Sequence, residues 1–327
     1  MLRLFVKSRP YLVTGAILFL AAFNTSNALD VPIAQVPDEI YDRYLNPVKA
    51  DDPAASLRRE ADAGNALAAY YLALRHSSYC PRDLRIVADR DLAFAYMRRA
   101  AELSNRPRAV AVLALYHLNG WGTPRDLDRA AELATQAKAK GQTLGYRVLG
   151  EVHLQRAEAR SAELTALPPG ADLAPAARAG KLTGLETDIR TALENLTVAA
   201  DRGNAGALKA LARIHDQGDL GRPRNHRLAT ECYQRAALRR DERAARTLAE
   251  RFALGEKAEP DLKLAYAWTL VEAQLTEEKT EPRRRRDELE KRLAVAEKLA
   301  AQELAAQWLA QMPSEEETAR ARLDPDR

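Results

Sequence analysis

A recurring helical hairpin is the feature that most constrains this chain of 327 residues. It is clearest over residues 106–141, where an apolar run ends in a turn at residues 119–122 that contains two glycines. A second segment with helical apolar spacing opens near Asp126 and stops at a third glycine. A hairpin this small cannot bury its apolar faces alone, so copies of it must stack on one another.

Five copies of this hairpin follow each other in the sequence. Each has a Leu–small pair, a ring three residues later, and an Asp or Asn that opens the second helix. The first-helix anchors are Leu72–Ala73–His76, Leu113–Ala114–His117, Leu149–Gly150–His153, Leu211–Ala212–His215 and Leu248–Ala249–Phe252. The second helices open at Asp89, Asp126, Asp188, Asn225 and Asp261. The small residues, Ala114 and Gly150 among them, predict that the two helices of a hairpin approach closely.

This pattern resembles the Sel-one-like repeat (SLR) family, which is related to the tetratricopeptide repeats. The resemblance covers about Ala55 to Ala273. It implies an all-α fold, an α/α solenoid with a right-handed superhelix of about five hairpins and helical caps. It also implies that the first helices line the concave side and that the array mainly holds other proteins. The departures from the family are two interrupted turns and His residues where the family usually has Tyr.

The anchors divide the chain into segments. We expect a solenoid over residues 53–275. A capping region should follow over 276–312, because its apolar residues have helical spacing. The tail at 313–327 should be disordered, because it has almost nothing to bury. The solenoid consists of a half-repeat at 53–64 and repeats at 65–105, 106–141, 142–203, 204–241 and 242–275. The apolar cap residues are Leu289, Leu293, Ala296, Leu299, Ala300, Leu304 and Trp308.

Residues 1–28 have the features of an export signal. Three cations precede the apolar run Tyr11–Phe23, and Ser26 and Ala28 form a small-x-small cleavage site. Thirteen residues are too few to span a bilayer comfortably, which argues against an uncleaved anchor. We therefore expect a periplasmic protein that starts at Leu29, with residues 29–52 as a lead-in and capping segment.

The third repeat carries an insertion at residues 157–186. Its flanks favour helix, whereas its middle contains Pro168, Pro169 and Gly170. One interpretation is a lengthened hairpin with a mobile tip. The other is a partner-binding loop, because insertions in solenoids map to loops that are free to diverge.

The charge distribution argues against nucleic-acid binding. The formal net charge is +4, and removing the signal with its three cations and no anion leaves +1. Cations and anions are interspersed, as expected of solvated helix faces. No phosphate-binding glycine loop follows a strand, so we also expect no nucleotide cofactor.

No catalytic or metal-binding pattern stands out. Four of the five histidines occupy the ring position of successive repeats, where stacked helices would hold them about 8–10 Å apart, too far for one metal ion. We expect each of these rings to pack inside its own hairpin, and His226 has no evident partner. Cys80 and Cys232 lie three repeats apart, so no intramolecular disulfide is expected unless the superhelix curls sharply. The sequence therefore favours a protein without enzymatic activity.

Two features are candidates for partner binding. Arg147, Lys209 and Arg246 share one position of successive first helices and would form a basic row, which is either a solvated face or a binding stripe. Trp121 lies beside two turn glycines and is either an interface anchor or packed against the neighbouring hairpin.

These observations together predict an exported, non-enzymatic scaffold or adaptor of the periplasm that binds an envelope protein or an extended peptide. The family resemblance adds two settings, exopolysaccharide export or assembly and the restraint of a membrane sensor kinase. A cell-wall or carbohydrate-processing enzyme is a further alternative, which would need a pair of carboxylates in a cleft. A monomer is expected, with no integral membrane span after cleavage.

Overall fold

The computed structural model describes residues 53–77, 88–104, 106–166, 175–218, 223–276, 280–314 and 317–318. All of them belong to the unit formed by residues 34–327. The predicted export signal, the lead-in at 29–52, Cys80, the tip of the insertion and most of the tail lie outside the described residues.

The described residues are almost entirely helical and contain no strand. The helices are α3 (Pro53–Asp62), α4 (Ala66–His76), α5 (Arg90–Ser104), α6 (Pro107–Asn119), α7 (Leu127–Ala139), α8 (Thr143–Thr165), α9 (Pro175–Asp201), α10 (Ala205–Gln217), α11 (His226–Ala237), α12 (Glu242–Leu254), α13 (Leu262–Leu275), α14 (Thr280–Glu290) and α15 (Val295–Gln311).

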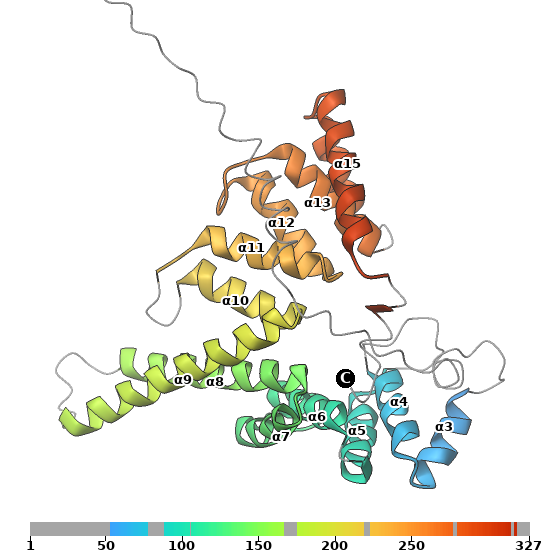
Figure 1. Cartoon of the computed structure of the whole chain (residues 1–327), viewed down its shortest axis with the longest axis vertical. Coiled ribbons are helices and arrows are strands. Elements are labelled where there is room, and N and C mark those ends of the chain that lie inside the picture. Colours follow the sequence, from blue (N-terminus) through green and yellow to red (C-terminus); the bar gives the residue numbers. More distant parts are fainter. Residues whose placement is uncertain are drawn as a thin grey trace, which may run out of the picture. The chain divides into compact units, whose positions relative to one another are not determined.

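Five successive helix pairs pack as hairpins, α4–α5, α6–α7, α8–α9, α10–α11 and α12–α13 (Figure 1). The second helix of each hairpin also packs on the first helix of the next, while α3 packs on α4, and α14 and α15 pack on α13. The predicted all-α repeat fold is confirmed. The hand of the superhelix stays a prediction.

One hydrogen bond closes the hairpin turn in four of the five copies. The backbone N–H of the Asp or Asn that precedes the second helix donates to the carbonyl of the ring residue near the end of the first. The N···O distances are 2.9 Å for Asp89–His76, 2.9 Å for Asp126–His117, 2.7 Å for Asn225–His215 and 3.0 Å for Asp261–Phe252. The same side chains accept hydrogen bonds from the first backbone N–H groups of the helices that they cap. The same Asp or Asn thus fixes both the turn and the helix start. The expectation that Asp188 opens the second helix of the third hairpin was wrong, because α9 spans Pro175–Asp201 and Asp188 lies inside it.

The apolar faces of the hairpins join into two neighbouring core clusters, which meet near Val152 and Leu154 on α8. Small residues dominate the closest contacts. Ala73, Ala114, Ala212 and Ala249 are fully buried, and a Cβ built on Gly150 would lie only 2.7 Å from Cγ of Leu196. The close approach predicted at the Leu–small pair is therefore confirmed for the third hairpin.

The capping region forms two helices rather than one. Trp308 of α15 stacks on Trp268 of α13, with ring centroids 4.1 Å apart. Among the predicted core residues of this region, Leu289, Leu293 and Trp308 are buried. Ala296 is exposed and Leu299 is 56 % exposed, so the assignment of these two to the core was wrong. The break between α14 and α15 resets the helical phase, and Ala301 and Ala305 face the core instead.

The contact at Gly150 gives a direct test of the repeat register. Replacing Gly150 by Leu should overpack the α8–α9 seam and lower the free energy of unfolding by about 1–3 kcal/mol. The matched control is Gly180→Leu in α9. A Cβ there would meet nothing within 4 Å, and an exposed helical Gly gains helix propensity on substitution. Thermal melting of both variants checks this, and a Gly150→Leu midpoint at or above that of the wild type would contradict it.

A second prediction separates backbone strain from steric clash at two glycines with positive φ. Gly141 has φ +78° and open space around its Cβ position, so Gly141→Ala should cost about 1–2 kcal/mol from the backbone alone. Gly122 has φ +65°, and a Cβ there would lie 2.1 Å from the carbonyl oxygen of Arg90. We therefore expect Gly122→Ala to lose clearly more stability than Gly141→Ala in urea unfolding, and equal losses would show that this turn does not pack on α5.

Candidate interaction surface

The three cations of the predicted basic row each have a carboxylate partner within the fold. Arg147 Nε lies 2.9 Å from Glu151 Oε1, and Lys209 Nζ lies 2.7 Å from Asp241 Oδ2. Arg246 Nε lies 2.7 Å from Glu272 Oε1, and this hydrogen bond raises the pKa of Arg246 above its ordinary value. All three charges are therefore compensated within the fold, by an i,i+4 partner for Arg147 and by partners distant in the sequence for Lys209 and Arg246.

These side chains brace the stacked helices. The Arg147 guanidinium covers Gly206 of α10, where a Cβ would lie 2.5 Å from its Cζ. Lys209 of α10 reaches Asp241, the residue that caps α12. Arg147 and Lys209 thus link successive first helices, whereas Arg246 links the two helices of the fifth hairpin. Binding of a partner by these residues stays a prediction.

Trp121 lies in the turn between α6 and α7 and is partly buried. Its ring meets that of Tyr116 edge-on, with centroids 6.1 Å apart. The adjacent Gly122 rests against the first turn of α5, which belongs to the preceding hairpin. Trp121 therefore has a packing role, and its contact with a partner also stays a prediction.

The repeated histidines do not share a single environment. His76 stacks on Tyr96 of its own hairpin, whereas His117 meets Phe94 of the preceding hairpin edge-on at 5.5 Å, so the expectation that this ring packs inside its own hairpin was wrong. Burial lowers the pKa of His117. Nδ1 of His153 lies within hydrogen-bond distance of Asp188 Oδ1, at 2.7 Å. Within the described part of the chain, no group of three His, Cys, Asp or Glu residues could hold a metal ion.

Cys232 of α11 is a free, partly buried thiol. Burial raises the pKa of this thiol, which keeps it protonated at neutral pH. Because Cys80 lies outside the described residues, the expected absence of a disulfide between the two stays a prediction.

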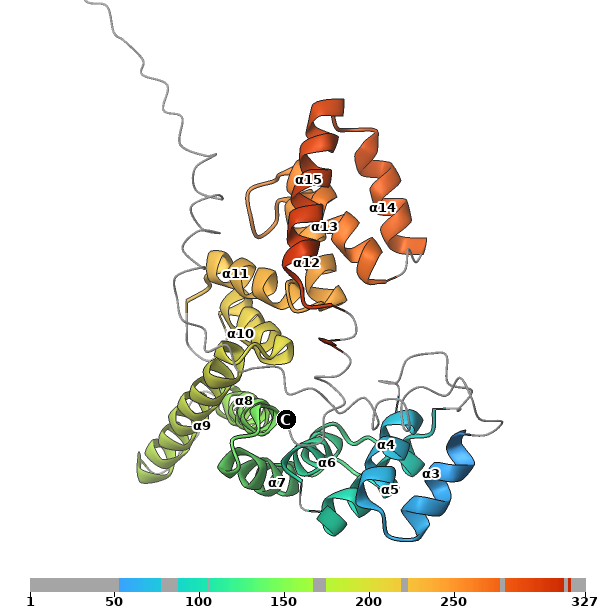
Figure 2. The same cartoon turned by 45° about the vertical axis from the view of Figure 1, so that its right-hand side comes forward.

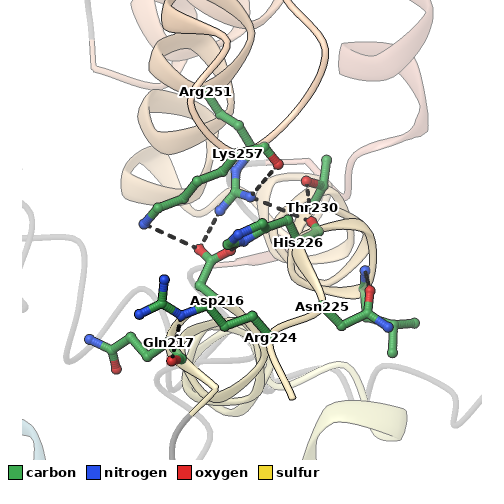
Figure 3. Close-up of polar contacts among 9 residues, drawn as sticks. Asp216, Gln217, Arg224, Asn225, His226, Thr230, Arg251 and Lys257 are labelled. Carbon is green, nitrogen blue, oxygen red and sulfur yellow. Dashed lines mark hydrogen bonds and ion pairs between the residues drawn. The ribbon is translucent and has the colours of Figure 1, made fainter.

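The turn of the fourth hairpin holds a buried ion-pair cluster around Asp216 (Figure 3). One oxygen of Asp216 meets Nδ1 of His226 at 3.1 Å, and the other pairs with Arg251 of α12 and lies 4.0 Å from Nζ of Lys257. Arg251 also stacks on the ring of Tyr233. The expectation that His226 has no partner was therefore wrong.

Sequence reasoning missed this cluster although the alignment of repeats carried a signal for it. The position after the ring residue holds Leu118 and Leu154 in the second and third hairpins and Asp216 in the fourth. The position before the ring residue holds Ile214 in the fourth hairpin and Arg251 in the fifth. Opposite charges at two normally apolar positions of neighbouring repeats indicate a pair, because an unpaired buried charge is costly.

The third hairpin extends well beyond the other four (Figure 1). Helices α8 and α9 have 23 and 27 residues, whereas α6 and α10 have 13 each. We call the part made of residues 156–166 and 175–190 the arm. Of the two interpretations of the insertion, a lengthened hairpin describes its helical flanks, and its tip lies outside the described residues.

Ion pairs between the two helices hold the arm in one shape. Asp188 of α9 is buried and accepts from His153 at 2.7 Å and from Arg160 at 2.8 Å, both on α8. Further out, Lys181 pairs with Glu163 at 3.1 Å. The arm nevertheless leaves Leu182 of α9 44 % exposed. The arm thus presents an exposed apolar side chain outside the repeat stack, on helices that ion pairs link.

No helix among the described residues is both long enough and apolar enough to cross a bilayer. No curated protein sequence matches the chain.

Comparison with solved structures returns other helical repeat proteins. One is a protective antigen present in uropathogenic Escherichia coli strains that displays an SLR fold, with 18 % identity and a TM-score of 0.34 over 86 % of this chain and 69 % of the other. Another is a Sel1 repeat protein from Oxalobacter formigenes, with 18 % identity and a TM-score of 0.41 over 68 % of this chain and 84 % of the other.

The Sel1 repeat family model matches four segments, residues 66–105, 107–142, 176–204 and 205–241. These coincide with the α4–α5 and α6–α7 hairpins, with α9 of the third hairpin, and with α10–α11. The family model leaves residues 143–175, which contain α8, and the fifth hairpin α12–α13 unmatched. The chain is therefore a Sel1 repeat protein.

Proposed function

We propose that this protein is a non-enzymatic adaptor that binds an envelope protein through its arm. Sel1 repeats are generally scaffolds for protein–protein interaction. The single observation that carries the assignment to the arm is the extension of α8 and α9 beyond the repeat length, with exposed Leu182 on a frame fixed by ion pairs. A rigid surface loses little conformational entropy on binding, which favours its use in recognition.

The proposed setting is the periplasm, with exopolysaccharide export or assembly as the process served. Support for export comes from the three cations, the apolar run and the small-x-small site at residues 1–28. Restraint of a membrane sensor kinase is the alternative setting. The two differ in the partner, so its identity distinguishes them.

The first prediction here concerns processing. Cleavage after Ala28 should leave Leu29 as the first residue of the protein recovered from the periplasmic fraction. Sequencing of the N-terminus after osmotic release measures this. Recovery of the intact Met1 form in the membrane fraction would contradict export in soluble form.

A second prediction tests the arm. Replacing Leu182 by Glu should weaken capture of the envelope partner by about tenfold or more, because a charge would be placed at the apolar centre of the contact. The measurement is quantitative co-purification from envelope fractions with the tagged full chain, followed by binding of the isolated partner.

Leu103 of α5 supplies the control. It is 49 % exposed, similar to Leu182, but lies on an ordinary repeat helix far along the chain from the arm. Leu103→Glu should capture the partner as the wild type does. If Leu182→Glu captured the partner as well as the wild type does, the arm would be removed from the proposal. If both variants lost the partner to the same extent, the cause would be a general effect of added charge.

A further inference from the structure

Helix α14 has an unusual composition for an element at the end of an apolar stack. Its sequence, TEPRRRRDELE, contains eight charged residues among eleven. Only Pro282 and Leu289 are buried. Isolated helices of this length are marginal in water, so the contacts of α14 with the rest of the fold must hold it in place.

Those contacts are mainly ionic, and Arg285 makes the central ones. Its guanidinium donates through Nη1 to Glu272 of α13 and through Nη2 to Glu250 of α12, the second at 2.9 Å. Glu272 is completely buried, and its other oxygen accepts from Arg246 at 2.7 Å. A third contact joins the hydroxyl of Tyr266 to Glu290 at 2.7 Å, and burial, followed by this hydrogen bond, raises the pKa of Tyr266 to about 12.

Helix α15 is held on α13 by a different kind of contact. The Trp268–Trp308 stack and the buried Ala301 and Ala305 provide an apolar seam. Figure 2 shows α14 and α15 as separate helices that both adjoin α13. Residues 276–294 thus connect two helices that pack on each other without help from α14.

We propose that α14 is a releasable strap that fills an arginine-receiving site with its own Arg285. The site consists of Glu272 and Glu250, while the hydroxyl of Tyr266 binds Glu290 of the strap. Its ligand in trans is an arginine-bearing helical segment of another protein. This inference does not depend on the arm or on the identity of the envelope partner.

The charges make such an exchange feasible. When α14 leaves, Glu272 keeps Arg246 as a partner and gains water at the oxygen that Arg285 vacates, so no buried charge is stranded. The strap gives up only two buried side chains of its own. A planar guanidinium suits a site with two carboxylates, because it can donate to both at once.

Hydrogen–deuterium exchange of the full chain tests the release of α14. Its backbone amides should exchange faster than those of α13 and α15, because α14 buries only two side chains. Arg285→Ala should speed exchange in α14 by about 10- to 100-fold, the effect of losing hydrogen bonds to charged groups. The matched control is Arg284→Ala, because Arg284 is exposed and its partner among the described residues is the exposed Glu288.

Binding in trans tests the site itself. A fluorescent peptide of residues 280–292 should bind the full-length Arg285→Ala protein at least about tenfold more tightly than the same peptide with Arg285 replaced by Ala. Adding Glu272→Gln to the protein should abolish that preference, and circular dichroism checks that both proteins are folded.

Several outcomes would overturn the proposal. The first needs only the wild type: the proposal is wrong if the amides of α14 exchange no faster than those of α13 and α15. Equal effects of Arg284→Ala and Arg285→Ala, or equal binding of the two peptides, would do so as well. If the arm were shown not to bind a partner, these measurements would be unaffected.

Discussion

The close approach of alanine-faced helices is the constraint on which the rest of the structure depends. The small residue of each Leu–small pair is buried, and at Gly150 the helices leave no space for a Cβ beside Leu196. Dispersion contacts at this separation are many and individually weak, so they stabilise only when the whole seam is in register. Since each hairpin has apolar surface on both sides, the stack needs caps at its ends, as α3 and the C-terminal helices provide.

Apolar contacts alone do not select one register between stacked helices, whereas contacts of buried charged groups do. Asp188, Asp216 and Glu272 are each buried, and each meets at least two cationic or imidazole groups. Sliding one helix by a turn would leave these carboxylates without partners, which costs more than losing an apolar contact. The ion pairs therefore select one register among several that the apolar faces would accept.

The two departures from the repeat pattern carry the functional proposals. The arm lengthens one hairpin and exposes an apolar side chain outside the stack, and α14 ends the stack with a polar helix held by ion pairs. A repeat array serves many partners, so the features that distinguish one member lie in its insertions and ends.

The sequence by itself determined the hairpins, because their signals are local. The apolar spacing, the turn glycines and the capping Asp or Asn act within a few residues, and in four of the five hairpins the structure places the second helix where they predict. The third hairpin is the exception, because α9 spans Pro175–Asp201 and Asp188 lies inside it. The ring position was found as well, although the sequence did not indicate that His117 would meet the preceding hairpin.

The partners of charged residues were decided only by the tertiary structure. Arg246 and Glu272 are 26 residues apart, and Asp216 and Arg251 are 35 apart. No local pattern links residues at such separations, so the cations read as an exposed row are braces between helices. The tertiary structure also decided which face of α15 is buried. A four-residue break after α14 changes the helical register of its apolar residues, and the packing of Trp308 on Trp268 fixes the side that faces the core.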